Sequence, residues 1–352
     1  MTGLGSRWLR RGATLATGLA LLAVAACERP LEPPSKAKDT ASAARSATRA
    51  EPVAPGGQSA SARSDGPPAP GSLARHPAPK RLVAVGDLHG DLAATRRVLR
   101  LAGVLDEADH WAGGDAWLVQ TGDEVDRGDD DRAVLDLFER LAVEAEAAGG
   151  RVIALLGNHE LMNAALDFRY VASASFAAFV GVPGADPALP ALARLPEPER
   201  ARAAAFRPGG PYAVRLARRP LYAVVGDSVF VHGGLTPKHV RYGLERLGLE
   251  VATWLRGEGP GPPALAIADD GPVWLRRYSA APDSEDCRVL ADTLAALDAR
   301  RMVVGHTVQR GGVSSACDER VWRIDVGLSA SYGGKPGALA IEADRVTVIA
   351  EP

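Results

Sequence analysis

Five short segments that combine glycine with Asp, Asn or His constrain this chain more than any other feature of its sequence. Each follows an apolar run that reads as a buried strand. Asp, Asn and His supply the oxygen and nitrogen atoms that divalent metals bind, and the glycines permit tight turns. The segments are 86–90 (GDLHG), 122–128 (GDEVDRG), 157–160 (GNHE), 232–234 (HGG) and 305–307 (GHT). Side chains placed just past successive strands of an open α/β sheet converge on one edge, so the pattern predicts a binuclear metal centre.

The regions between these segments predict an α/β fold. Apolar runs and helical patterns alternate, with strands expected at 81–85, 116–120 and 151–156 and helices at 92–102 and 133–148. This alternation with short loops predicts a βαβ architecture. Further strands are expected at 221–225, 229–231, 302–304, 321–324 and 346–349, the first two as a hairpin. Consecutive strands with little helix between them predict a second sheet packed on the first.

From about residue 164 to 213 the apolar periodicity weakens and the composition becomes rich in Ala, Pro and Arg. We expect a helical insertion over the strand ends, where it could cap the site and shape specificity. A surface helical excursion without substrate contact is the alternative.

Residues 1–27 predict a lipoprotein signal peptide. A basic stretch with Arg7, Arg10 and Arg11 precedes an apolar run over 13–26 that is too short for a comfortable membrane span. The run ends in LAVAAC, which resembles a bacterial lipobox, so cleavage would leave Cys27 as an acylated N-terminus that anchors the protein to a membrane. We therefore expect an exported bacterial lipoprotein, periplasmic or at the cell surface. A core helix or an ordinary signal, with Cys27 incidental, is the alternative.

Residues 28–79 predict a disordered tether, since a segment rich in Ala, Ser, Pro and Gly with almost no aromatics cannot bury enough apolar surface to fold. The folded unit is then expected over 80–352, a length that suits one large α/β domain. Cys287 and Cys317 fall in this unit. In an exported protein they are expected either to form a disulfide or to remain two separate buried thiols.

The formal net charge is −2 and 46% of residues are hydrophobic. A chain with this balance is not a nucleic-acid binder by bulk electrostatics, and no nucleic-acid partner is expected. The apolar content is enough for a sizeable core.

The order and spacing of the five segments resemble those of the calcineurin-like metallophosphoesterases, in their phosphoprotein-phosphatase branch with its GDxHG, GDxVDRG, GNHE and HGG signatures. The resemblance covers about residues 83–328. The GHT segment, the Trp274-Leu275-Arg276 run, residues 206–210 and residues 323–329 look like the bacterial Shewanella-like protein phosphatases. The resemblance implies a four-layer αββα sandwich of two mixed sheets, with the metals at the strand ends.

The resemblance also implies a role for each motif residue as a metal ligand. Asp87 and His89 would bind the first metal and Asp123 would bridge both. The remaining ligands, which complete the second metal, would be Asn158, His232 and His306. A shared carboxylate lowers the cost of holding two cations close together, and neutral Asn and His keep the site cationic enough to attract phosphate. The cofactors would be two divalent ions, with manganese, iron and zinc all acceptable to these ligands.

Three further residues carry catalytic roles in the resembled family. His159 would donate a proton to the leaving-group oxygen, Asp126 would orient its ring, and Arg127 would bind phosphoryl oxygens. Because His159 directly follows Asn158, we expect the turn to point it away from the metal and toward substrate.

The remaining substrate contacts are less specific in the sequence. Asn158 is expected to contact substrate as well as metal. Of two neighbouring arginines, Arg276 is favoured over Arg277 as a second phosphate-binding residue. Asp325 is expected either to hydrogen-bond a ligand histidine or to shape a turn.

These features predict a metal-dependent phosphomonoester hydrolase, a protein phosphatase that uses a metal-bridging hydroxide for in-line attack on phosphorus. The expected partner is a phosphorylated protein. A dinucleoside polyphosphate or small phosphoester hydrolase is the alternative. A non-catalytic tethered metal-binding module is disfavoured, because it would have no need of Asp126, Arg127 and His159.

Overall fold

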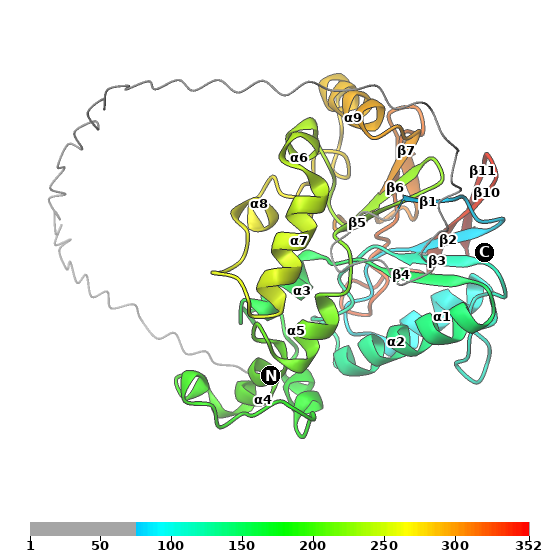
Figure 1. The fold of residues 1–352 in the computed structure, drawn as a ribbon. Coiled ribbons are helices and arrows are strands. Elements are labelled where there is room, and N and C mark those ends of the chain that lie inside the picture. Colours follow the sequence, from blue (N-terminus) through cyan, green and yellow to red (C-terminus); the bar gives the residue numbers. More distant parts are fainter. Residues whose placement is uncertain (1–74, 352) are drawn as a thin grey trace, which may run out of the picture. The chain divides into compact units, whose positions relative to one another are not determined.

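The computed structural model describes residues 75–351, which form two mixed sheets stacked face to face (Figure 1). In the first sheet the strand order is β11-β10-β2-β3-β4. The parallel strands β2, β3 and β4 form one side of it, and the C-terminal hairpin of β10 and β11 pairs antiparallel with β2. The strands are β2 (Leu82–Val85), β3 (Trp117–Gln120), β4 (Arg151–Ala154), β10 (Gly337–Glu342) and β11 (Arg345–Ala350).

The second sheet has the order β1-β5-β6-β7-β9-β8. Strands β5 and β6 form the predicted hairpin, and β6, β7 and β9 run parallel. The strands are β1 (Arg75–His76), β5 (Tyr222–Val225), β6 (Ser228–Val231), β7 (Arg301–Val304), β8 (Ser314–Ala316) and β9 (Val321–Arg323).

Side-chain alternation along the strands divides the core into layers, because successive strand residues face opposite sides of a sheet. Between the sheets, Ala84 and Val119 of the first pack with Phe230 and Val303 of the second. On the other face of the first sheet, the alternate residues of β2 and β3 contact α1 (Leu92–Leu101) and α2 (Asp131–Ala147).

The outer face of the second sheet is covered in the same way. Val229 and Val304 pack with residues of α7 (Leu244–Leu255) and α9 (Ser284–Ala296), beside α6 (Pro237–Tyr242). The four-layer αββα prediction is confirmed.

Local signals explain where the principal elements begin. Asp91 accepts a hydrogen bond from the Ala94 amide and so caps α1, as its position before an apolar periodic run indicates.

The first sheet also contains β10, which the sequence patterns did not single out. Its pairing partner, β2, lies about 250 residues earlier, and no local pattern encodes so distant a contact.

The N-terminal boundary of the folded unit differs from the predicted residue 80. Arg75 and His76 form β1, which pairs in parallel with β5, so the sheet begins ahead of that boundary. The predicted signal peptide at 1–27, including Cys27, and most of the predicted tether at 28–79 lie outside the described residues. Within 75–351, no helix has both the length and the apolar character needed to cross a membrane.

The region predicted as a helical insertion contains short helices. Between α3 (Asn158–Ala164) and β5 lie η1 (Ser173–Phe179), η2 (Pro190–Leu192), α4 (Glu197–Phe206) and α5 (Pro211–Leu216). Helix α4 contacts both η1 and α3, so the insertion packs against the helix that follows β4.

Cys287, in α9, forms a disulfide with Cys317, in the turn between β8 and β9. Of the two alternatives for these cysteines, a disulfide or two separate thiols, the disulfide is confirmed.

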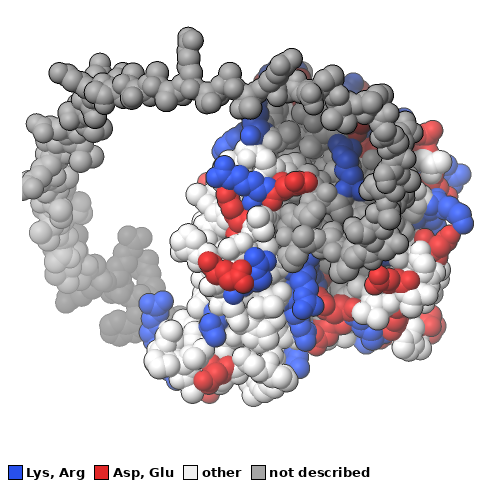
Figure 2. Space-filling model, viewed as in Figure 1, with Lys and Arg blue, Asp and Glu red and all other residues white. Residues whose placement is uncertain are grey.

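On the face seen in Figure 2, basic and acidic side chains are intermixed over the described residues, in keeping with the small net charge.

Candidate active site

The structure brings the six predicted metal ligands together at one end of the two sheets. Each lies in the loop or helix start that follows a strand: Asp87 and His89 after β2, Asp123 after β3, Asn158 after β4, His232 after β6 and His306 after β7. All six are buried. Strands that run in the same direction end at the same edge, which is why residues more than 200 positions apart become neighbours.

One half of the cluster contains the four residues assigned to the second metal. His232 Nε2 lies 2.9 Å from Asn158 Oδ1 and 3.2 Å from Asp123 Oδ2. The candidate ligand atoms of Asp123, His232 and His306 lie within 4.8 Å of one another.

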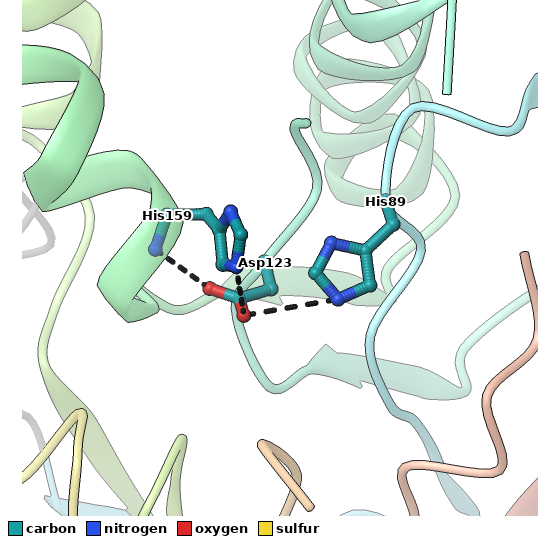
Figure 3. A group of neighbouring side chains, drawn as sticks. All are labelled: His89, Asp123 and His159. Carbon is teal, nitrogen blue, oxygen red and sulfur yellow. Dashed lines mark hydrogen bonds and ion pairs between the residues drawn. The ribbon is translucent and has the colours of Figure 1, made fainter. Parts of the chain in front are cut away.

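The other half contains the residues assigned to the first metal. His89 Nε2 lies 3.9 Å from Asp87 Oδ2 and 4.0 Å from Asp123 Oδ2. Figure 3 shows His89 and His159 on either side of the Asp123 carboxylate. Asp123 thus faces both halves, the position that a bridging ligand requires.

The ligand loops adopt backbone conformations that are rare outside glycine. His89, Asp123 and His306 have positive φ angles of 48°, 61° and 67°. Such strain persists only where surrounding structure fixes it, and it concentrates at functional sites. Gly157 allows this close packing, because a Cβ at that position would overlap the Asp123 carboxylate.

Backbone carbonyls orient the three histidines that are predicted as ligands. His89 Nδ1 lies 3.2 Å from the Val125 carbonyl oxygen, and His232 Nδ1 lies 2.9 Å from that of Thr121. His306 instead uses Nε2, 3.1 Å from the Trp274 carbonyl. When each of these nitrogens donates its proton to a carbonyl, the other ring nitrogen is left with a lone pair for a metal.

Burial and neighbouring carboxylates shift the pKa values of the candidate ligands in different directions. Burial lowers the pKa of His89 to about 4 and that of His306 to about 2, so both rings are neutral as ligands must be. Burial, reinforced by the nearby Asp325 carboxylate, raises the pKa of Asp87 well above its usual range. Burial opposes protonation of His232 as well, yet the carboxylates of Asp123 and Asp87 raise its pKa to about 10.

The donor set therefore fits two divalent metals. Two buried carboxylates, Asp87 and Asp123, have no Lys or Arg partner among the described residues. Buried charges are normally paired or bound to metal. The mixed oxygen and nitrogen ligands are those that Mn²⁺, Fe and Zn²⁺ accept.

His159 lies at the start of α3 with its ring held by Asp126. His159 Nδ1 is 2.7 Å from Asp126 Oδ2, and both side chains are buried. Burial lowers the pKa of His159, but the Asp123 and Asp126 carboxylates outweigh it and raise the pKa above its usual value. Its Nε2 lies 3.8 Å from Asp123 Oδ2, so the ring faces the ligand cluster, and its direction toward substrate and away from a bound metal stays a prediction.

Arg127 is exposed at the rim of the site between two half-buried tyrosines. Its guanidinium carbon lies 4.0 Å from the ring centre of Tyr170 and 5.8 Å from that of Tyr332. Tyr170 also lies 5.2 Å from the His159 ring, and Tyr332 the same distance from the His89 ring. Tyr170 comes from the insertion, so this segment contacts the site and is not a remote surface excursion.

The two candidate arginines of the 274–278 run occupy different environments. Arg276 Nη1 donates to the carbonyl of the predicted ligand His306 at 2.7 Å and to Thr307 Oγ1 at 2.9 Å, which places it beside the candidate metal site. Arg277 forms an ion pair with Asp286 at 2.9 Å. The preference for Arg276 as a phosphate-binding residue stays a prediction.

Asp325 takes the second of its two predicted roles. Its Oδ1 accepts the Gly327 amide at 2.9 Å, so it shapes a turn, and no bond to a ligand histidine is present among the described residues. Burial raises its pKa to about 6.

Sequence reasoning missed several residues that support the site. Glu160 accepts the backbone amides of Asp123, Glu124 and Gly157. Its place three residues into a helix, after glycine, is a recognisable capping signal. Arg202 of the insertion contacts Asp126, and no local signal marks it.

Comparison with known proteins agrees with this geometry. The family model described as calcineurin-like phosphoesterase matches residues 80–310. The chain is 40% identical to Shewanella-like protein phosphatase 2 of Arabidopsis thaliana over 299 residues, 76% of each chain. It is 29% identical to Shewanella-like protein phosphatase 1 of Plasmodium berghei, covering 76% of this chain and 74% of the relative.

Among solved structures, the fold is similar to that of the cold-active protein-tyrosine phosphatase of a psychrophilic Shewanella species. The TM-score is 0.63 at 23% identity, and the match covers 79% of this chain and 80% of the other. The chain belongs to the calcineurin-like phosphoesterase family and is a metal-dependent phosphoester hydrolase.

Proposed function

We propose that this calcineurin-like phosphoesterase is a protein phosphatase with His159 as its general acid. The observation that carries this proposal is the buried Asp126–His159 pair, 2.7 Å apart and directed at the ligand cluster. A metal site with a purely structural role would have no use for such a pair. The 40% identity to a protein named as a Shewanella-like protein phosphatase supports the substrate class.

The ligand cluster supplies the first part of the chemistry. When bound, two divalent cations there act as Lewis acids that polarise the phosphoryl group and lower the pKa of water. Asp87, His89, Asp123, His232 and His306, with Asn158, would hold them. The other steps belong to the protein's own side chains.

Arg127 and His159 then act on the substrate. The planar guanidinium of Arg127 binds phosphoryl oxygens, with Arg276 as a second cation beside His306. His159 donates a proton from Nε2 to the departing oxygen. Its Nδ1–H remains bonded to Asp126, which stabilises the protonated ring before transfer.

The rim of the site favours an aromatic phosphoester. Tyr170 and Tyr332 flank Arg127, and offset or edge contacts with an incoming ring contribute about 0.5–1.5 kcal/mol each. We therefore expect phosphotyrosine peptides to be hydrolysed faster than phosphoserine or phosphothreonine peptides.

A phosphate-release panel tests the substrate class. It contains phosphotyrosine, phosphoserine and phosphothreonine peptides of one backbone sequence, with a dinucleoside tetraphosphate as comparison. The chain is assayed with Mn²⁺ and after chelation, and metal analysis of the isolated protein identifies the native ions. Faster turnover of the dinucleotide than of every peptide would refute the protein-phosphatase proposal.

The proposed location is outside the cytoplasm, on a membrane, through lipid attached to Cys27. The signal-like pattern of residues 1–27 supports it, and the Cys287–Cys317 disulfide suits an oxidising compartment. Radiolabelled palmitate should enter the wild-type chain but not Cys27→Ser. Equal labelling of both would refute the anchor.

A further inference from the structure

Arg202 is a fully buried arginine beside the catalytic pair. It lies in α4 of the insertion with a side-chain exposure of 0%. Its Nη2 is 3.0 Å from Asp126 Oδ1 and 2.6 Å from Asp131 Oδ2. A guanidinium is almost never fully buried unless it is paired, and here one cation is shared by two buried carboxylates.

The remaining faces of Arg202 are fixed by the insertion and by α3. Its Nε donates to Asn163 Oδ1 at 2.7 Å, and its Nη1 donates to Ser175 Oγ at 2.9 Å. The rings of Phe179 and Phe206 lie 4.9 and 5.0 Å from its guanidinium carbon. The planar fork is therefore held in one position by packing and hydrogen bonds together.

These contacts leave the Asp126 carboxylate a single orientation. Oδ1 accepts from Arg202 and from Asn163 Nδ2, 2.9 Å away, while Oδ2 faces His159 Nδ1. The Asp126 amide donates to Asp131 Oδ1 at 2.9 Å, so the backbone of the same residue is tied to the second carboxylate.

We propose that Arg202 is a positioning residue, through which the insertion sets the orientation of the general acid by fixing Asp126. This inference rests on the proposed role of His159. It makes the insertion part of the catalytic apparatus, in addition to any effect that the insertion has on specificity.

Removal of the guanidinium would leave Asp126 and Asp131 buried side by side with no cation between them. Their repulsion would move the Asp126 carboxylate, and the His159 ring bonded to it would follow. A displacement of about 1 Å in a reacting group can cost about 10²-fold in rate.

The test uses the metal-loaded full chain and two aryl phosphates. Phenyl phosphate has a poor leaving group that needs a proton, whereas 2,4-dinitrophenyl phosphate has a good one that does not. The measured quantity is the ratio of kcat on the dinitrophenyl ester to kcat on the phenyl ester. Arg202→Met is expected to raise this ratio at least about tenfold with little change in KM.

Arg219→Met is the matched control. Arg219 is also buried and pairs with a buried carboxylate, Glu124, at 2.9 Å, but it makes no contact with Asp126 or His159 among the described residues. Its loss should lower stability while leaving the ratio near the wild-type value. Arg202→Lys keeps the charge, so its ratio should lie between those of wild type and Arg202→Met. If Arg202→Met does not fold, Arg202→Lys takes its place in the test.

His159→Ala separates the two proposals. If it leaves the ratio unchanged, the general-acid role fails and the positioning role with it. If His159→Ala raises the ratio but the Arg202 variants do not, or if Arg219→Met raises it equally, the positioning role alone is wrong.

Discussion

Glu160 should determine how firmly the metal loops are held, and the isosteric change Glu160→Gln isolates that role. Its Oε2 accepts the amides of Asp123 at 2.9 Å and Gly157 at 2.7 Å, and Oε1 accepts that of Glu124 at 2.8 Å. A glutamine can keep an oxygen at only one of these positions. Even in its better orientation, one amide then faces an NH₂ group, and the other two lose a charged acceptor.

The magnitude follows from these three bonds. A hydrogen bond to a charged group contributes about 1.5–3 kcal/mol, and an unsatisfied buried amide costs about 1–3 kcal/mol. Burial raises the pKa of Glu160, so the wild type already bears a desolvation cost that glutamine relieves. The net loss of unfolding free energy should be about 2–3 kcal/mol. For a domain of this size that corresponds to a fall of about 3–5 °C in Tm.

The assay is thermal unfolding of both proteins at one saturating Mn²⁺ concentration, because bound metal itself raises Tm. Glu144→Gln is the control, since Glu144 also accepts a backbone amide, from Trp111 at 2.7 Å, but is partly exposed, with 25% of its side chain accessible to solvent. Its cost should be smaller than that of Glu160→Gln, because water can hydrate the groups that lose the carboxylate. A Glu160→Gln protein that melts within about 1 °C of wild type would refute the reasoning.

Three further predictions follow from individual contacts. Arg276→Met should lower kcat/KM by about 10-fold or more, because the substrate phosphate loses a charged contact. Arg277→Met should change kcat/KM less than about twofold. Steady-state kinetics in which both variants lose kcat/KM equally would contradict this prediction. The Cys287–Cys317 disulfide closes a loop of 30 residues, so its reduction should lower the free energy of unfolding by about 3–4 kcal/mol. Denaturant unfolding measures this change, and an unchanged midpoint would contradict the prediction. Burial raises the pKa of Glu144, but the hydrogen bonds donated to its carboxylate outweigh burial and lower the pKa to about 2. The ionised carboxylate therefore stabilises the folded protein above about pH 4.5, and this stabilisation is lost as pH falls toward 2. The difference in stability between wild type and Glu144→Gln should shrink over that range, and a difference that persists at pH 2 would be the contrary result.

Much of the catalytic centre could be predicted because its information is local. Each ligand, such as Asp87 or His306, directly follows an apolar strand, so the chain order of the motifs fixes which edge of the sheet they reach. The helix cap at Asp91 and the β5–β6 hairpin are encoded in a few adjacent residues for the same reason. The residue types then indicate divalent metals, and the resemblance of the motifs to a known family implies phosphoester hydrolysis.

The tertiary structure decided what depends on contacts between distant segments. Strand β10 joins the first sheet through pairing with β2, and nothing in its own six residues indicates that partner. The His159 ring is held by Asp126, 33 positions away in the sequence.

Arg202 illustrates the limit most clearly. In the sequence it is one of several arginines in a weakly periodic region, yet in the fold it lies fully buried between two carboxylates. Burial of that charge is favourable only where Asp126, Asp131 and the surrounding rings are already assembled. The sequence by itself predicted the ligands and the reaction class, through residue types at strand ends and the resemblance of the five segments to a known family. The support that orients the general acid arises only when the insertion packs against the core.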